Sequence, residues 1–498
     1  MCRIPDVSLV VFNNKTQSSS WASDYSNILQ CSTNNMASNS GGMNPEHAEA
    51  ESENTSHSTS EVEEEMEVVD PENSDMEESD GEGGERRVYL PGDPLDEGEM
   101  LVRDDSAYHM YHQAQTGAPC LSFDVLRDSL GENRTSYPHT VFAVAGTQAE
   151  KAHLNNVIIM KMTNLHRTSQ KDDDDDSDED SDSDDEDSKP ELETAMLKHL
   201  GSVNRIRSTD IGQKQVAATW ADTGTVHLWD LTSALQAVNN AHLMGRFMRQ
   251  ESHKPLFSFT GHQIEGYAID WCPTASGNLI TGDCRRNIHL WKLQEGGEWS
   301  VDQRPYAAHA ESVEDLQWSP NEKNVFASCS VDKSIRIWDV RATPSKACMI
   351  TMKEAHSSDV NVIHWNRKDP FILSGGDDGV LNVWDLRQFQ KKAPPVAKFK
   401  HHTGPITSVE WNPQDSTVFA AAGSDDQLTL WDLSLERERE TAPEGESGQS
   451  RLDGIPPQLL FVHQGQSDIK ELHWHPQIPG VLISTAHSGF NIFKTISV

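Results

Sequence analysis

The segment DKSIRIWDVR, residues 332–341, alternates polar and apolar side chains and ends in a Trp-Asp pair followed by Val-Arg. Alternation with a period of two is typical of a half-buried β-strand. Similar strand endings recur along the chain at Trp229, Trp291, Trp338, Trp384 and Trp431, and Phe493 stands in the last such position. Successive spacings are 62, 47, 46, 47 and 62 residues. A repeat of about 40–45 residues that ends in Trp-Asp predicts a WD-repeat β-propeller with one four-stranded blade per repeat.

A histidine and an aspartate accompany these tryptophans. Histidines open four repeats, at positions 262, 309, 356 and 402, and in three repeats an aspartate lies six residues before the Trp. Because a buried polar group must be paired, we expect each aspartate to bind the histidine and the histidine to reach the Trp-bearing strand. Repetition every 46–47 residues favours a structural over a catalytic role. The predicted relay comprises His309, Asp332, Trp338, His356, Asp378, Trp384, His402, Asp425 and Trp431.

Three repeats depart from this pattern. Arg285 occupies the aspartate position of blade three, Thr223 occupies it in blade two, and Phe493 replaces the last Trp. The sequence predicts weaker relays in these blades without changing the predicted fold.

The repeats account for six blades over residues 202–494, and a closed ring needs another. Residues 119–165 contain three strand-like segments, PCLSFDVL, TVFAVAGTQA and NNVIIMKMTNL. The predicted fold class is therefore all-β, a seven-bladed propeller over residues 119–498. The inserts 231–255 and 436–457 explain the two long spacings and are expected to loop out.

Residues 86–118 are predicted to be a linker and an N-terminal helix, preceded by a disordered acidic tail over residues 1–85. In DDSAYHMYHQAQTG, Asp104 or Asp105 suits a helix cap and Gly117 suits its end. A helix over 104–115 would place Tyr108 and Tyr111 on one face. Such a helix would cap the edge of the ring, with a partner-binding groove around the two tyrosines as the alternative.

The net charge of −38 is concentrated in the first 199 residues, with 44 acidic and 13 basic residues against 35 and 28 in residues 200–498. This charge disfavours contact with nucleic acid or anionic membrane and favours basic proteins as partners. No run of 18 apolar residues is present, so no membrane span is expected.

Residues 171–190 form an acidic insert, predicted to connect blades one and two. Too costly to bury, its carboxylates must be solvated. The insert is either a solubilising linker or a polyanionic binding segment for a basic partner, formed by Asp172, Asp173, Asp174, Asp175, Asp176, Asp178, Glu179, Asp180, Asp182, Asp184, Asp185, Glu186 and Asp187. Ser177, Ser181 and Ser183 each have an acidic residue three positions later, a pattern that suits acid-directed kinases.

Motifs for catalysis, cofactors and metals are missing. The chain has no GxxxxGK[ST], GxGxxG, HExxH or GxSxG pattern, and its seven cysteines include no CxxC pair. We therefore expect a non-enzymatic protein of a reducing compartment, with no cofactor and no metal.

The order of an acidic tail, PCLSFDVLRD (119–128), FAVAGTQA (142–149), an acidic tract and WD repeats resembles the glutamate-rich WD-repeat family over residues 88–498. It is also similar to histone-binding WD-repeat proteins, in which an N-terminal helix and a neighbouring loop form a groove for a histone helix. The resemblance implies a nuclear and nucleolar chaperone for a basic protein of the large ribosomal subunit. It also implies contact with pre-ribosomal particles and core histones, without a membrane or a specific nucleic-acid sequence.

A different class of function is indicated by WDVR (338–341) and WDLR (384–387) on consecutive blades. The pair, with Arg341 and Arg387, resembles a docking box for the adaptor of a cullin-type ubiquitin ligase. An arginine after Trp-Asp is common, so an ordinary strand end is favoured here.

Overall fold

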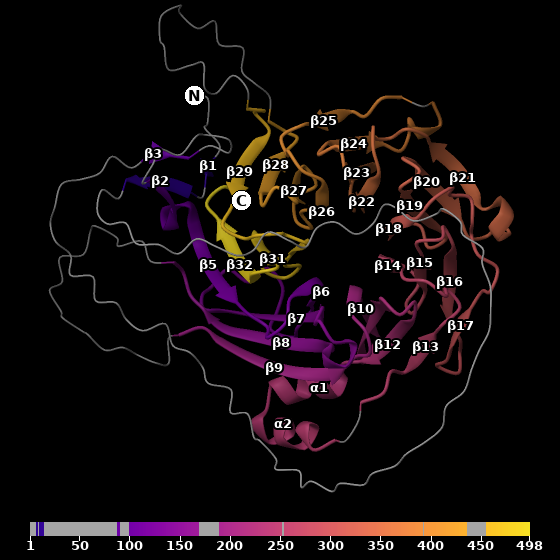
Figure 1. Cartoon of the computed structure of the whole chain (residues 1–498), viewed down its shortest axis with the longest axis horizontal. Coiled ribbons are helices and arrows are strands. Elements are labelled where there is room, and N and C mark those ends of the chain that lie inside the picture. Colours follow the sequence, from indigo (N-terminus) through magenta and orange to yellow (C-terminus); the bar gives the residue numbers. More distant parts are fainter. Residues whose placement is uncertain are drawn as a thin grey trace, which may run out of the picture.

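The computed structural model describes residues 6–7, 9–13, 87–89, 99–168, 189–250, 253–391, 393–435 and 455–498. Within these residues the chain forms a seven-bladed β-propeller, with the blades arranged as a ring around a central axis (Figure 1). The three segments predicted from residues 119–165 are strands of blade one, so the predicted blade number is confirmed.

The first three blades run in chain order. Blade one contains β6 (Cys120–Leu126), β7 (His139–Thr147), β8 (Asn156–Leu165) and β9 (Glu191–Lys198). Blade two contains β10 (Val203–Ile211), β11 (Lys214–Ala221), β12 (Val226–Asp230) and β13 (Phe257–Phe259). Blade three contains β14 (Ala268–Trp271), β15 (Leu279–Gly282), β16 (Ile288–Leu293) and β17 (Trp299–Val301).

The remaining blades complete the ring. Blade four contains β18 (Val313–Trp318), β19 (Val325–Ser330), β20 (Ile335–Asp339) and β21 (Cys348–Met352). Blade five contains β22 (Val360–Trp365), β23 (Phe371–Gly376), β24 (Leu381–Asp385) and β25 (Ala397–Phe399). Blade six contains β26 (Ile406–Trp411), β27 (Val418–Gly423), β28 (Leu428–Asp432) and β29 (Leu459–His463). Blade seven contains β30 (Glu471–Trp474), β31 (Val481–Ala486), β32 (Gly489–Thr495) and β5 (Tyr108–Ala114).

The hydrophobic core lies between neighbouring blades. Leu290 of blade three, for example, packs in one buried cluster with Leu316 and Trp338 of blade four. Each blade is apolar on both faces, as in the wholly buried strand β27. A blade therefore buries its surface only when both neighbours are in place, which couples the stability of the blades around the ring.

Blade seven closes the ring with strands from both parts of the chain. Its outer strand β5 pairs antiparallel with β32, with Tyr111 opposite Phe493. The helix predicted over 104–115 is therefore wrong, apart from a short 3-10 turn, η1 (Asp105–Ala107), which Asp104 caps. The segment is a strand because burial alternates from Tyr108 to Met110 and the free edge of β32 offers hydrogen bonds.

The acidic insert interrupts blade one, because β8 and β9 on either side of it pair with each other, Thr163 lying opposite Glu191. The prediction that it connects blades one and two is therefore wrong. Without a Trp-Asp ending in this blade, the sequence did not mark the fourth strand.

The insert 231–255 does not loop out as predicted. It forms α1 (Thr232–Val238) and α2 (Ala241–Met248). Ala234, Val238 and Phe247 are buried in the cluster that joins blades one and two. The apolar residues of this insert thus cover the outside of the ring (Figure 1). Residues 436–454 of the second insert lie outside the described residues.

The predicted relay is present in blades four, five and six. In blade four, His309 Nδ1 lies 2.9 Å from Asp332, and its Nε2 lies 2.6 Å from Ser328 Oγ. Trp338 Nε1 donates to the same hydroxyl at 2.8 Å. The serine hydroxyl thus links the histidine to the tryptophan. Equivalent chains are His356–Ser374–Trp384 with Asp378, and His402–Thr429–Trp431 with Asp425.

The departures expected in blades two and three are compensated. In blade three, Asp283, two residues before Arg285, holds His262 at 2.9 Å. In blade two, His199 Nδ1 donates to the carbonyl oxygen of Gly201 at 2.9 Å, so no aspartate is required. In blade seven, the ring of His463 stacks on Phe493 with centroids 4.2 Å apart.

Part of the predicted disordered tail forms strands. β1 (Asp6–Val7) pairs parallel with β29, and β2 (Leu9–Asn13) pairs with β3 (Arg87–Val88) and β4 (Glu99–Arg103). The remaining 3-10 turns are η2 (Ala152–Leu154), η4 (Pro344–Lys346) and η5 (Phe389–Lys391). In the part of the chain that the structure describes, no helix is long and apolar enough to span a bilayer.

We expect the fold to lose stability as the pH falls from 7 to 5. Burial lowers the pKa of His463 and of His475 to about 3, whereas an unfolded histidine titrates near pH 6.5. The contribution of each is therefore complete above pH 6.5 and is lost as the pH falls towards the folded pKa. At pH 5 each such histidine should remove about 2 kcal/mol from the free energy of unfolding.

Urea unfolding at pH 7 and pH 5 measures this loss. His463→Gln, which cannot be protonated, should show a smaller difference between the two pH values than the wild type. Equal stability of the wild-type protein at both pH values would contradict the prediction.

Candidate functional site

Most of the acidic insert lies outside the described residues, including Asp172–Asp187 and the predicted phosphorylation sites. Its two attachment points are described. The backbone N–H of Thr168 donates to the carbonyl oxygen of His109 on β5 at 3.2 Å. At the other end, Asn164 Nδ2 donates to the carbonyl oxygen of Lys189 at 3.2 Å. Both ends of the insert are thus held where blades one and seven meet.

The two tyrosines of the predicted groove have different environments. Tyr108 is 1% exposed, and its hydroxyl lies 2.5 Å from Nδ1 of His463. Tyr111 is partly buried, and the Arg103 guanidinium lies 4.0 Å from the centroid of its ring. Tyr108 therefore belongs to the core, whereas Tyr111 lies closer to the surface. Since the segment is a strand, the two do not form one face of a helix.

Arg341 and Arg387 directly follow the equivalent strands β20 and β24 of blades four and five. Both side chains are 69% exposed. Each guanidinium binds the aspartate two residues before it, Asp339 at 2.5 Å and Asp385 at 2.9 Å. The two arginines are thus presented in matching surroundings on adjacent blades, as adaptor docking requires and as an ordinary strand end also produces.

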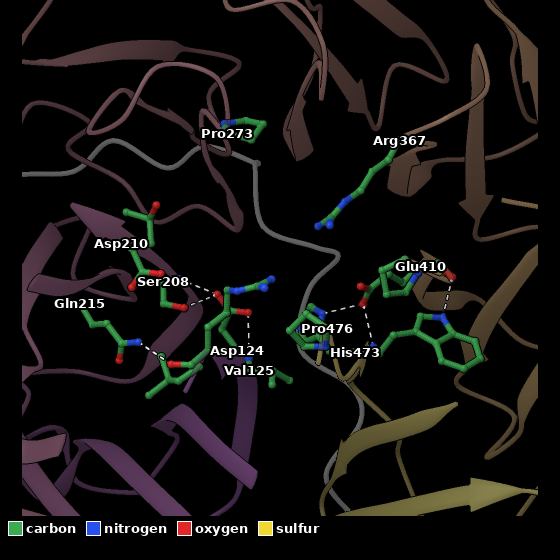
Figure 2. Close-up of a pocket in the computed structure, with 15 residues that line it drawn as sticks. Asp124, Val125, Ser208, Asp210, Gln215, Pro273, Arg367, Glu410, His473 and Pro476 are labelled. Carbon is green, nitrogen blue, oxygen red and sulfur yellow. Dashed lines mark hydrogen bonds and ion pairs between the residues drawn. The ribbon is translucent and has the colours of Figure 1, made fainter. Parts of the chain in front are cut away.

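The inner strands of all seven blades line a central cavity of about 290 Å³ that contains many charged side chains. A second cavity of about 330 Å³ adjoins it, and Figure 2 shows Arg367 and Glu410 on one side of it and Asp124 and Ser208 on the other. These charges on inner strands were not predicted.

Glu471 on β30 is the centre of the charged network. Its side chain is 1% exposed and lies 2.6 Å from Arg205 and 2.7 Å from Arg207, both on β10. The Ser122 hydroxyl and the Phe123 backbone N–H on β6 donate to its other oxygen at 2.6 and 2.9 Å. Although burial raises the pKa of this carboxyl, Arg207 and Arg205 hold it well below its usual range. One carboxylate thus joins blades seven, one and two.

His473, two residues further along β30, is a buried cation. Its Nδ1 lies 2.8 Å from Glu410 on β26. Burial lowers its pKa, but Glu410 and then Glu471 raise it to about 10. The histidine is therefore protonated at neutral pH, in contrast to His463 and His475, and it ties blade seven to blade six.

Other inner-strand carboxylates accept backbone N–H groups from the next blade. Asp124 accepts from Ser208 at 2.6 Å, Asp270 from Trp318 at 2.6 Å, and Asp315 from Ile363 at 3.0 Å. Burial raises the pKa of Asp270 to about 8. These contacts make the network a structural connection between blades.

A sequence signal for this network exists. Asp270, Glu410 and His473 each stand directly before a Trp, in DWCP, EWNP and HWHP, where the inner face of an apolar strand would otherwise continue. The corresponding HWNR has Arg367 where the others have proline, and Arg367 extends into the cavity in Figure 2. Among the described residues, no group of three or more His, Cys, Asp and Glu side chains could hold a metal ion.

Two family models match the chain. One, described as histone-binding protein RBBP4 or a component of the CAF1 complex, matches residues 98–166. The WD domain, G-beta repeat, matches residues 301–339, 346–385 and 393–432. The first match covers the strands at which the ring closes, and the second covers blades four to six.

Three relatives are similar over most of their length. Protein HEAT STRESS TOLERANT DWD 1 of Arabidopsis thaliana is 46% identical, over 83% of this chain and 92% of the relative. Ribosome assembly protein rrb1 of Schizosaccharomyces pombe is 40% identical, over 85% and 87%. Glutamate-rich WD repeat-containing protein 1 of Dictyostelium discoideum is 46% identical, over 84% and 86%.

We expect Glu471→Gln to destabilise the fold strongly. Removing one partner of a buried ion pair leaves uncompensated charge, here on Arg205 and Arg207, and typically costs about 3–5 kcal/mol. The free energy of unfolding in urea measures the loss. Glu298→Gln, on an exposed loop, removes the same charge and should leave stability nearly unchanged. Equal stability of the two variants would show that the network does not hold the blades together.

Proposed function

Because the chain belongs to the glutamate-rich WD-repeat protein family, we propose that it is a non-enzymatic chaperone in the assembly of the large ribosomal subunit. In this proposal it binds a basic ribosomal protein and delivers it to pre-ribosomal particles. The observation that carries the proposal is the 40% identity to a protein named for ribosome assembly, over 85% of this chain.

The charge of the chain supports a basic client. Ribosomal proteins carry Lys- and Arg-rich extensions that would otherwise bind RNA non-selectively. Thirteen carboxylates within residues 172–187 can neutralise such an extension without a fixed geometry. Each exposed ion pair contributes only about 0.2–1 kcal/mol, so many pairs are needed and salt weakens them. The same weakness allows ribosomal RNA to displace the acidic insert at delivery.

The attachment of the acidic insert supports a division of roles. Its ends are fixed at Thr168 and Lys189, so its carboxylates stay near the ring. The rigid ring would supply specificity, and the acidic insert would shield the charged extension. Phosphorylation of Ser177, Ser181 or Ser183 would add about −1.5 to −2 charges per site and strengthen the shielding. The same proposal places the protein in the nucleus and the nucleolus.

A second candidate function is histone binding. The match of residues 98–166 to a model described as a histone-binding protein favours it. Core histones are also basic, so the same acidic insert would serve both kinds of client. In this case Tyr111 and its neighbours on β5 would lie close to the client, instead of a helical groove. Adaptor docking through Arg341 and Arg387 stays a third hypothesis.

We expect neutralising the acidic insert to weaken client binding without affecting the fold. The variant changes every Asp and Glu in 172–187 to Asn and Gln, which keeps the loop length. Affinity for a basic ribosomal protein should fall, and its dependence on salt should become shallower, as measured by titration at two salt concentrations. The thermal melting temperature should stay nearly unchanged, and a large decrease would show that the insert is packed.

Affinity purification after ribonuclease treatment separates the two candidate functions. We expect one basic ribosomal protein of the large subunit to stay bound, because direct binding does not require RNA. Recovery of histones alone would contradict the ribosomal proposal and favour the second candidate.

A further inference from the structure

Three cationic side chains lie together where the acidic insert leaves blade one. We call His109, Arg167 and Lys494 the root patch. The Arg167 guanidinium lies over the ring of Tyr137, 5.0 Å from its centroid. His109 is on β5, which pairs with β32, the strand that carries Lys494. The patch thus combines the end of β8 with the two strands that close the ring.

The root patch lacks a counter-charge. Burial and then Arg167 lower the pKa of Lys494. Burial, Lys494 and then Arg167 lower the pKa of His109. No carboxylate is among these influences, and within the described ranges neither Arg167 nor Lys494 forms an ion pair. The patch is therefore an uncompensated positive charge on the surface of a strongly acidic protein.

The nearest negative charge in the sequence is the acidic insert itself. Three residues, 169–171, separate Thr168 from Asp172. At about 3.3–3.6 Å per residue, four steps along the chain span at most about 14 Å. Thr168 is itself fixed against His109. A polyanion attached this closely has an effective concentration in the millimolar range, which an external polyanion does not reach in dilute solution.

We propose that the root patch binds carboxylates of residues 172–187 of the same chain when no client is present, so that a basic client must compete with the patch. This inference rests on the proposed function, because it assigns regulation to the client-binding insert. Two or three exposed ion pairs are weak individually, so the patch lowers client affinity without preventing binding. The device would set the affinity low enough for release.

The test uses a fluorescently labelled decalysine peptide as the probe and the full-length chain. The variant Arg167→Gln/Lys494→Gln removes two charges of the patch. Lys292→Gln/Lys353→Gln is the matched control, since it removes two exposed lysines elsewhere on the ring. We expect the patch variant to bind decalysine about 3–10-fold more tightly than the control, as two released ion pairs would give. In the variant with the neutralised insert, the same patch substitutions should have no effect.

Several results would overturn the inference. Equal affinity of the patch variant and its control would show that the patch does not compete. Tighter binding that persists after the insert is neutralised would assign the effect to net charge alone. Binding of a single-stranded polyuridine probe that disappears with the patch substitutions would show that the patch serves an external polyanion. A wild-type chain that binds no decalysine would instead overturn the proposed function, and this inference with it. Unchanged thermal melting confirms that each variant is folded.

Discussion

The closure of the ring is the constraint on which the rest of the structure depends. A propeller blade is apolar on both faces, so an open ring would expose two of these faces to water. Closure is achieved by the pairing of β5 with β32 and by Glu471, which connects blades seven, one and two. Backbone hydrogen bonds at the outer strand and a buried ionic network at the axis thus hold the same blades.

The closure point is also where the proposed client-binding insert is attached. The insert leaves from β8 beside β5, and the root patch is formed by residues of both elements. The region from β4 to β8 coincides with the match to a histone-binding family model. Partner binding, if it uses this region, would therefore act on the part of the ring that completes the fold. The rigid ring and the charged insert then have separate physical roles in the proposed function, shape recognition and charge neutralisation.

Two kinds of buried polar contact serve different purposes in this fold. The His–Ser/Thr–Trp relays link strands within a blade, and their aspartates hold the turns in place, as with His309 and Asp332. The inner-strand carboxylates act between blades, as with Asp270 and Trp318. Both kinds satisfy polar groups in an apolar interior, and each fixes a geometry that apolar contacts alone would leave less well defined.

The sequence by itself determined the propeller, because strand alternation and the spacing of Trp338, Trp384 and Trp431 are local properties that recur along the chain. It also determined the relay, since the paired residues keep a constant separation. Only the tertiary structure decided that residues 108–114 form a strand, because a short segment follows whichever hydrogen-bonding edge is available to it. It likewise decided the place of the acidic insert and the partners of Glu471, since these depend on contacts between residues more than 250 positions apart, as between Arg207 and Glu471. Such pairs have no fixed spacing, and so no pattern in one sequence reveals them.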